Sequence, residues 1–175
     1  MRCILVLMLL APAAYAETLS GRVLSVETGD AISVEDGKKK MRKVRLSGID
    51  APEKGQSFAR QSEQNLSRMV YGKPVTVYYR KYDRYGRIVG KVMVAAPGAC
   101  PAVQVECPKT LDAGLAQITV GLAWYHKEHA QEQSPEDGER YGFAESDARA
   151  RRAGLWADPK PMSPWEWRRV KRKEH

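Results

Sequence analysis

The stretch VRLSGIDAPE, from Val44 to Glu53, decides the fold and the site that this sequence predicts. Its first residues alternate, because apolar Val44 and Leu46 are separated by polar Arg45 and Ser47. A period of two is typical of a strand with one buried face. Arg45 is therefore predicted to point away from the face that carries Val44 and Leu46.

The end of this strand gathers charged groups. Gly48 permits a bend, and Pro52 cannot donate a hydrogen bond to a neighbouring strand, so the strand is predicted to end near Asp50. Asp50 and Glu53 are then expected on a turn at the strand's end. Taken alone, such a cluster is also typical of a solvated surface ion pair, which contributes little to stability.

Two further segments add ionisable groups to this cluster. Residues 26–32, VETGDAI, have the form of a tight turn between strands, with Gly29 free to adopt a positive φ and Asp30 directly after it. Residues 82–87, YDRYGR, form a second polar turn before an apolar strand and supply Arg87. Together the three segments offer three acids for a hard cation and two arginines for an oxyanion.

The order of the segments indicates a compact barrel. Apolar alternation predicts strands within 19–34, over 41–46, over 75–79 and over 88–94, with an amphipathic helix over 57–70. Later segments predict a helix over 111–123 with Thr110 as N-cap, and another that opens at Ser134 and Pro135 and closes at Gly154, with Tyr141, Ala144 and Ala148 in the core. Five strands and three helices fit an α+β fold built on a small closed barrel.

These segments resemble the staphylococcal nuclease (thermonuclease) family. The resemblance rests on Gly29-Asp30, on the run from Arg45 to Glu53, on the run from Asp83 to Arg87, and on GLAW at 121–124 and GLW at 154–156. It covers residues 18 to 168 in the same order with similar spacing. It implies an oligonucleotide/oligosaccharide-binding (OB) barrel and a calcium-dependent, sugar-non-specific nuclease. Such an enzyme acts on DNA and RNA and breaks the 5'-O bond to leave 3'-phosphate ends.

The resemblance also implies a role for each matching residue. Two positions depart from the family's usual Asp-Gly-Asp-Thr turn, because Thr28 replaces the first Asp and Ala31 replaces the Thr. The implied roles are Ca2+ ligation by Asp30, Asp50 and the carbonyl of Ala51, phosphate stabilisation by Arg45 and Arg87, general-base catalysis by Glu53, and substrate contacts by Arg84 and Tyr85.

The N-terminal residues have the layout of a secretory signal peptide. Arg2 precedes an apolar run, and Ala14-Tyr15-Ala16 is a small-residue ending that predicts cleavage after Ala16. The apolar run is too short to span a bilayer, so we expect no stable membrane anchor after cleavage. The prediction is an exported monomer, periplasmic or secreted, with a nuclease domain over 17–168 and a basic tail over 169–175.

The basic composition favours a polyanionic partner. The chain has 29 Lys and Arg residues against 21 Asp and Glu residues, a net charge of +8. Cleavage after Ala16 would leave 159 residues, enough for one domain, and a net charge of +7. This excess suits nucleic acid or an acidic surface. The aromatic and cationic C-terminus fits either phosphate contacts or tryptophan anchors with a solvated tail.

No catalytic role is predicted for the cysteines or the histidines. After signal cleavage Cys100 and Cys107 remain, and an exported chain with this close pair predicts a disulfide, with free thiols as the alternative. His126 and His129 lack a third metal ligand at suitable spacing and are predicted to be surface residues.

Two functions other than a nuclease agree with parts of the sequence. A catalytically inactive nucleic-acid-binding OB barrel would use the same basic surface and leave its ligand intact. A structural domain that binds an acidic envelope component would also use that surface, but it gives no reason for three acids and two arginines at these spacings.

Overall fold

A closed five-stranded barrel forms one half of the protein. The computed structural model describes residues 17–99 and 107–174. Antiparallel pairing runs in the order β3-β2-β1-β5-β6, and parallel pairing of β3 with β6 closes the ring. The predicted α+β barrel is therefore confirmed. Its strands are β1 (Glu17–Thr28), β2 (Ala31–Asp36), β3 (Met41–Leu46), β5 (Pro74–Tyr82) and β6 (Ile88–Val94).

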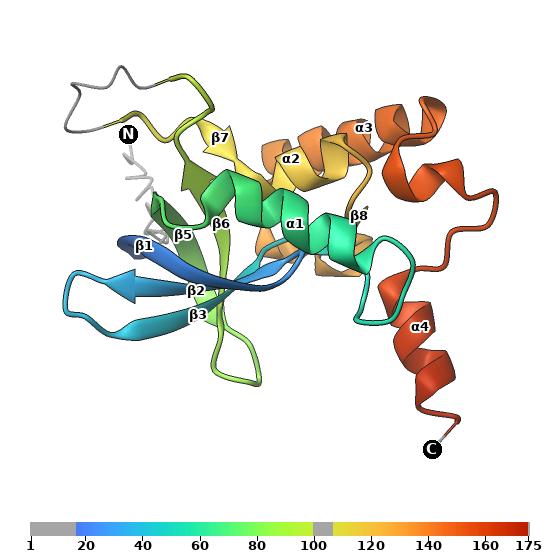
Figure 1. Cartoon of the computed structure of the whole chain (residues 1–175), viewed down its shortest axis with the longest axis horizontal. Helices are drawn as coiled ribbons and strands as arrows, with labels where there is room; N and C mark the ends of the chain where they lie inside the picture. The colour runs from blue at the N-terminus through green and yellow to red at the C-terminus, as the bar shows by residue number, and fades with distance from the viewer. Residues whose placement is uncertain (1–16, 100–106, 175) are drawn as a thin grey trace, which may run out of the picture.

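The helices lie beside the barrel. Figure 1 shows the barrel on one side of the molecule, α2, α3 and α4 on the other, and α1 across the junction between them. The helical segments are α1 (Ala59–Val70), α2 (Ala113–Thr119), α3 (Pro135–Ala150) and α4 (Pro164–Lys171), with 3-10 turns η1 (Lys127–Glu132) and η2 (Gly154–Ala157). Three short strands complete the fold. Strand β4 (Ile49–Asp50) pairs with β8 (Trp124–Tyr125), and β7 (Leu111–Asp112) pairs antiparallel with the end of β6.

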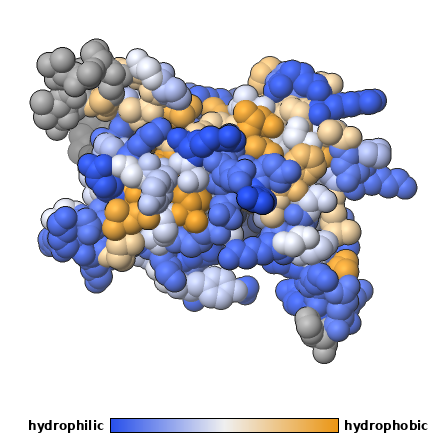
Figure 2. All heavy atoms as spheres, in the orientation of Figure 1, coloured by the Kyte–Doolittle hydropathy of each residue, from blue (hydrophilic) through white to orange (hydrophobic). Residues whose placement is uncertain are grey.

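The core follows from the alternation seen in the sequence. Val44 and Leu46 are buried while Arg45 between them is not, as predicted. Each aliphatic side chain removed from water contributes about 1.5–3 kcal/mol, as an upper estimate. On the face shown in Figure 2, hydrophilic residues predominate and hydrophobic residues form small patches among them. The barrel strands bury Val23, Ile32, Val34, Val44, Leu46, Val75, Val77, Ile88, Val92 and Val94.

Three helices have boundaries that differ from the sequence prediction, since α1 begins at Ala59 rather than at residue 57 and α2 covers Ala113–Thr119 rather than 111–123. Asp112, not Thr110, caps α2, because its carboxylate accepts the N–H groups of Gly114 and Leu115 while β7 pairs residues 111 and 112 with β6. Helix α3 begins after Ser134 as predicted, but it ends at Ala150, and Gly154 instead opens η2. The predicted core face of α3, at residues 141, 144 and 148, is confirmed as buried.

A fourth helix replaces part of the predicted basic tail. Helix α4 runs across residue 168, where the sequence placed the end of the domain. Ser163 and Glu166 form a capping box, and Pro164 occupies the first turn, where its missing N–H has no cost. This is the same start signal that opens α3, and the sequence analysis missed it at the second occurrence.

Two glycines explain why the separate GLAW and GLW motifs matter. The backbone of Gly121 has φ +69° and that of Gly154 has φ +53°, both in the left-handed region. A Cβ on Gly121 would lie 2.2 Å from the carbonyl oxygen of Ala153, and one on Gly154 would lie 2.3 Å from that of Gly121. Backbone-to-backbone contact at this point sets the ring of Trp124 4.4 Å from that of Trp156.

Several predictions lie outside the described residues. The signal peptide at 1–16 and Cys100 of the predicted disulfide are among them. Within residues 17–99 and 107–174, no helix combines the length and apolarity needed to cross a bilayer.

Candidate active site

The turn that carries Asp30 is built against α1 and α2. Gly29 does not adopt the predicted left-handed φ. Instead it is required sterically, since a Cβ at this position would lie 1.8 Å from Oγ of Ser62. The buried Gln117 amide donates to the carbonyl oxygens of Gly29, at 2.7 Å, and of Ser62, at 2.9 Å. These contacts fix the direction in which Asp30 leaves the barrel.

Two uncharged groups donate hydrogen bonds to the carboxylate of Asp30. Thr28 Oγ1 donates to Asp30 Oδ1 at 2.6 Å, and the Ala51 N–H donates to Oδ2 at 3.4 Å. Burial and the nearby charge of Asp50 nevertheless raise the pKa of Asp30 to about 6. Thr28 therefore supplies a hydroxyl to the carboxylate at the position where the resemblance would place an acid.

Asp50 reaches the site because β4 pairs with β8. Ile49 lies opposite Tyr125 and Asp50 opposite Trp124, and the N–H of His126 donates to the carbonyl of Gly48 at 2.9 Å. The strand of Val44 was predicted to continue to Asp50 but ends at Leu46, and Asp50 instead ends the separate strand β4, with its side chain buried. Burial raises its pKa above the ordinary value, although the pairing of Asp50 with an arginine opposes the shift.

The arginine that pairs with Asp50 is Arg168 of α4. Its Nη1 lies 3.2 Å from Oδ1 of Asp50 and its Nη2 lies 2.7 Å from Oδ2, so the guanidinium binds both carboxylate oxygens. The same Nη1 lies 2.6 Å from Oε1 of Glu53. The sequence analysis did not identify Arg168, because it lies 118 positions from Asp50 and no local pattern signals the contact.

Arg45 is held by a second carboxylate that the sequence analysis missed. Its Nη2 lies 2.7 Å from each oxygen of Glu132 in η1, and its Nη1 donates to the Ile49 carbonyl at 3.2 Å. Lys81 also reaches Glu132, at 3.1 Å. The pKa of Glu132 lies below its ordinary value. Burial opposes this shift, but Arg45, the Gly48 N–H and Lys81 together outweigh the effect of burial.

The remaining predicted residues lie on the hairpin between β5 and β6. Arg87 Nε contacts Oδ2 of Asp83 at 2.7 Å, and the guanidinium groups of Arg84 and Arg87 lie 4.9 and 5.5 Å from the centre of the exposed Tyr85 ring. Arg45 pairs with Val89 across β3 and β6. Arg87 lies in the turn directly before β6, two residues before Val89.

The structure therefore brings together most of the predicted set. The charges of Asp50 and Arg45 act on the pKa of Asp30, and those of Glu53 and Arg45 act on the pKa of Asp50, so the four groups lie near one another. Arg87 lies at the entrance to β6, the strand that pairs with the one carrying Arg45, and its ion-pair partner among the described residues is Asp83. Three groups that the sequence analysis did not place here complete the surroundings: Glu132, Arg168 and His126.

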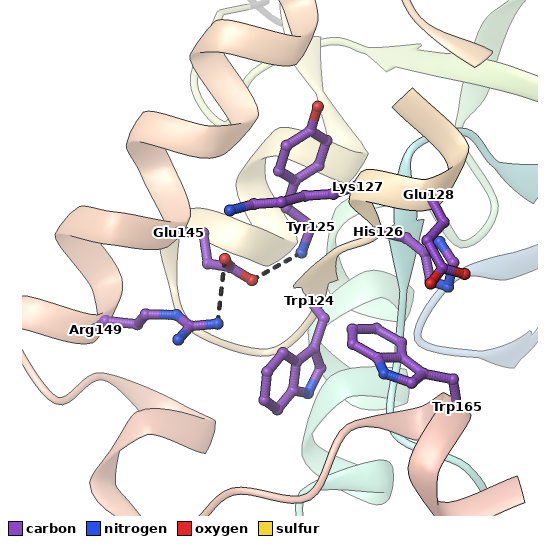
Figure 3. Close-up of a pocket in the computed structure, with 8 residues that line it drawn as sticks. All are labelled: Trp124, Tyr125, His126, Lys127, Glu128, Glu145, Arg149 and Trp165. Atoms are coloured by element: carbon purple, nitrogen blue, oxygen red, sulfur yellow. Dashed lines mark hydrogen bonds and ion pairs between the residues drawn. The ribbon is translucent and has the colours of Figure 1, made fainter. Parts of the chain in front are cut away.

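His126 corrects a prediction and connects the site to a cavity. It is buried rather than on the surface, its Nε2 lies 3.9 Å from Oδ2 of Asp50, and burial lowers its pKa. His129, in contact with its ring at 4.1 Å, is more exposed. Figure 3 shows the adjoining cavity of about 250 Å³, with the indole rings of Trp124 and Trp165 in one wall. Its lining also includes Tyr125, His126, Lys127, Glu128, Glu145 and Arg149.

The donor set fits a hydrated divalent ion with oxygen ligands. In the part of the chain that the structure describes, no group of three or more His, Cys, Asp or Glu side chains is arranged around one point as a metal site. Asp30 and Asp50 provide two facing carboxylates, and their mutual repulsion contributes to the raised pKa of Asp30. Two carboxylates supplemented by water and backbone carbonyls suit Ca2+ or Mg2+. The ligand role of the Ala51 carbonyl stays a prediction.

Comparison with known proteins agrees with this geometry. Residues 43–158 match the family described as staphylococcal nuclease homologue. The chain is 39% identical over 165 residues to Protein ParB of Escherichia coli, which covers 94% of this chain and 87% of that protein. It is 35% identical over 150 residues to a micrococcal nuclease of Shigella flexneri, covering 86% and 80%. It is also 35% identical over 153 residues to an uncharacterized endonuclease of Escherichia coli, covering 87% of each. On sequence similarity and barrel architecture together, the chain belongs to the staphylococcal nuclease family.

Proposed function

We propose that this chain is a calcium-dependent nuclease that hydrolyses phosphodiester bonds in DNA and RNA and leaves 3'-phosphate ends. Family membership, and relatives named micrococcal nuclease and endonuclease, support a nuclease that acts on nucleic acid. The observation that carries the proposal is the convergence of Asp30 with Arg45, Asp50 and Glu53, which come from two separate segments of the chain. The choice of Ca2+ as the metal and of 3'-phosphates as the product ends rests on the family resemblance.

Asp30 and Asp50 are the residues that would hold the divalent ion. When bound, the ion supplies positive charge to the phosphate oxygens and lowers the barrier for attack. The hydrogen bonds from Thr28 and Ala51 to Asp30 fix the orientation of that carboxylate before any ligand arrives. Preorganised ligands of this kind cost no reorganisation at the moment of reaction.

Glu53 is the proposed general base for the attacking water. Its carboxylate is half-exposed, so water can reach it, whereas Asp50 beside it is buried. The Glu53 N–H donates to the side chain of Gln56 at 3.0 Å, which fixes the backbone of the turn. A carboxylate near a cation and open to water can accept the proton that the attacking water loses.

Arg45 and Arg87 are the proposed stabilisers of the phosphate oxygens. Guanidinium groups remain charged and can donate two hydrogen bonds at once to an oxyanion. Each is held by a carboxylate, Glu132 or Asp83, which limits the conformations that the side chain must lose on binding. The proposal that Arg87 acts near the leaving oxygen rests on the family resemblance.

Low sequence preference follows from the expected contacts. Phosphate contacts supply affinity without reading bases, and the net charge of +8 favours long-range attraction of a polyanion. The same terms predict that encounter with nucleic acid weakens as salt concentration rises.

The decisive experiment follows cleavage and binding together. Purified protein is incubated with end-labelled DNA and RNA of one sequence, with Ca2+, with Mg2+ and with a chelator. The expected result is Ca2+-dependent cleavage of both strands, with ends that a 3'-phosphatase converts to 3'-hydroxyls. Salt-sensitive binding of intact strands under all conditions would identify an inactive OB-fold binding protein instead. Products with 5'-phosphate ends would contradict the assigned bond.

Export is proposed separately from catalysis. The layout of residues 1–16 supports cleavage after Ala16. Expression of the whole chain in a bacterial host, followed by N-terminal sequencing of the protein from the periplasm and the medium, tests it. A retained Met1 in a cytoplasmic product would overturn this proposal and leave the nuclease proposal unchanged.

A further inference from the structure

Arg168 links α4 to the turn after β4 through the acids of the candidate site. Its guanidinium contacts both oxygens of Asp50, at 2.7 and 3.2 Å, and one oxygen of Glu53, at 2.6 Å. A two-pronged contact between a guanidinium and a carboxylate is stronger and more directional than a single hydrogen bond between them. Arg168 thus occupies the oxygens that the proposed function assigns to the metal and to the attacking water.

Packing holds α4 in this position independently of the ion pairs. The capping box of Ser163 and Glu166 fixes the start of the helix, and the Gln56 amide donates to the carbonyl of Met162. The ring of Trp165 lies 4.8 Å from that of His126 and 5.5 Å from that of Trp124. Arg168 is therefore presented to the acids by a folded segment rather than by a free tail.

Electrostatics gives the contact a consequence. Asp50 is repelled by the neighbouring carboxylates of Asp30 and Glu53, and Arg168 offsets part of that repulsion. A divalent ion that binds Asp50 would lie within a few ångströms of the guanidinium, and two cations at such a distance repel strongly. Because 43% of the Arg168 side chain is exposed, it can rotate into solvent without unfolding the helix.

We propose that Arg168 is a resident counter-ion that a divalent cation must displace from Asp50 and Glu53, so that α4 controls metal loading of the site. The inference rests on the proposed role of Asp50 as a cation ligand. Displacement and cation binding are two sides of one equilibrium, so weakening the Arg168 contact must strengthen cation binding by the same factor.

Direct measurement of Ca2+ binding tests this without any activity assay. Calorimetric titrations compare the unchanged protein, Arg168→Gln and Arg169→Gln, all with their fold confirmed by circular dichroism. Arg169 is the matched control, because it is an exposed arginine of the same helix whose charge acts on Glu166 rather than on Asp50. Arg168→Gln is expected to bind Ca2+ about 5- to 150-fold more tightly, the usual range for coupled sites, and Arg169→Gln to match the unchanged protein.

Two further measurements separate competition from a structural role. Arg168→Lys keeps the charge but loses the fork, so its affinity is expected between those of the unchanged protein and Arg168→Gln. Hydrogen exchange of the α4 amides is expected to accelerate when Ca2+ is added to the unchanged protein, because the helix loses an anchor. In Arg168→Gln the same amides are expected to exchange at a rate that Ca2+ does not alter.

Each outcome decides the proposal. Equal or weaker Ca2+ binding by Arg168→Gln overturns it, since Arg168 would then be neutral or supportive toward the ion. Should the unchanged protein show no Ca2+ binding, detectable binding by Arg168→Gln supports the inference, and its absence there contradicts it. Asp50→Asn tests the assignment of Asp50 as a cation ligand, on which this inference rests. If the change leaves the Ca2+ affinity intact, Asp50 is not part of the metal site and the proposed function fails at that residue. The Arg168 titrations alone cannot give that result.

Discussion

Two arginine–carboxylate clusters border the candidate site and differ in their access to water. Arg45 and Glu132 have side chains that are 12% and 3% exposed, whereas Arg168 and Glu53 are 43% and 36% exposed, although Asp50, the second partner of Arg168, is 10% exposed. The first cluster joins the barrel to η1, and the second joins α4 to the turn after β4. The carboxylate of Glu132 in the first cluster is almost fully shielded from water, whereas Arg168 and Glu53 in the second are open to solvent.

This difference separates a permanent ion pair from an exchangeable one. A charge left alone in a buried position has no water to replace its partner, so breaking such a pair is costly. A charge at the surface is rehydrated when its partner leaves, and exposed pairs contribute about 0–1 kcal/mol. Arg45 is therefore suited to a fixed position, and Arg168 to a contact that a ligand can replace.

The largest effect is expected from removing Glu132. Glu132→Ala leaves Arg45 and Lys81 without their shared carboxylate, and we expect a loss of about 3–5 kcal/mol in the free energy of unfolding. Urea denaturation followed by tryptophan fluorescence measures it. Glu128→Ala, in the same 3-10 turn, is the control and should change stability little. A loss below about 1 kcal/mol would show that the buried cluster is no firmer than a surface pair.

A large effect on rate, with a small one on stability, is expected for Arg87. The Arg87 and Asp83 side chains are 30% and 16% exposed, intermediate between the two clusters. Loss of one preorganised charge stabiliser costs about 2.7–4 kcal/mol of barrier, so Arg87→Ala should lower turnover about a hundredfold or more. Steady-state cleavage of DNA measures it, with Lys39→Gln on the β2–β3 hairpin as the control. Unchanged turnover would remove Arg87 from the mechanism.

The general base is expected to show a similar separation. Glu53→Gln keeps the shape of the side chain but cannot accept a proton, and general-base catalysis contributes about 10²- to 10⁴-fold. Turnover should fall within that range while unfolding in urea changes by less than about 1 kcal/mol, because this side chain belongs to the exposed cluster. Full retained activity would assign proton transfer to another group.

A smaller effect on stability is expected for Arg168. Arg168→Gln breaks an exposed contact with Glu53 and a contact with the buried carboxylate of Asp50, and we expect a loss of about 1–3 kcal/mol in the absence of metal, which matches the expected change in Ca2+ affinity. Added Ca2+ should abolish that difference if the ion replaces the guanidinium charge. Thermal unfolding with and without Ca2+ provides the comparison. A loss as large as that of Glu132→Ala would contradict the distinction between the clusters.

The smallest effect is expected for a fully solvated pair. Lys39 and Glu35 lie 3.1 Å apart at the tip of the β2–β3 hairpin, and the Lys39 side chain is 84% exposed. Lys39→Gln should change the free energy of unfolding by less than about 0.5 kcal/mol. Urea denaturation at low and high salt gives the baseline against which the other pairs are judged.

The sequence by itself determined the barrel and the positions of Arg45, Asp50 and Glu53, each of which is one member of an ion pair. Alternation between Val44 and Leu46 located β3 and the outward side of Arg45, and Pro52 located the end of β4, because these signals act over a few residues. The turn at Asp30 was located correctly, although steric contact with Ser62, not a left-handed φ, explains Gly29. The position of the site followed from these local patterns.

Only the tertiary structure decided the partners. Glu132 lies 87 positions from Arg45 and Arg168 lies 118 positions from Asp50, so no short pattern relates them. The sequence predicts His126 at the surface, because it does not show that β8 pairs with β4. That pairing buries the ring of His126. Secondary structure depends on neighbours in the chain, whereas the pairing and burial of charges depend on which distant segments the fold packs together.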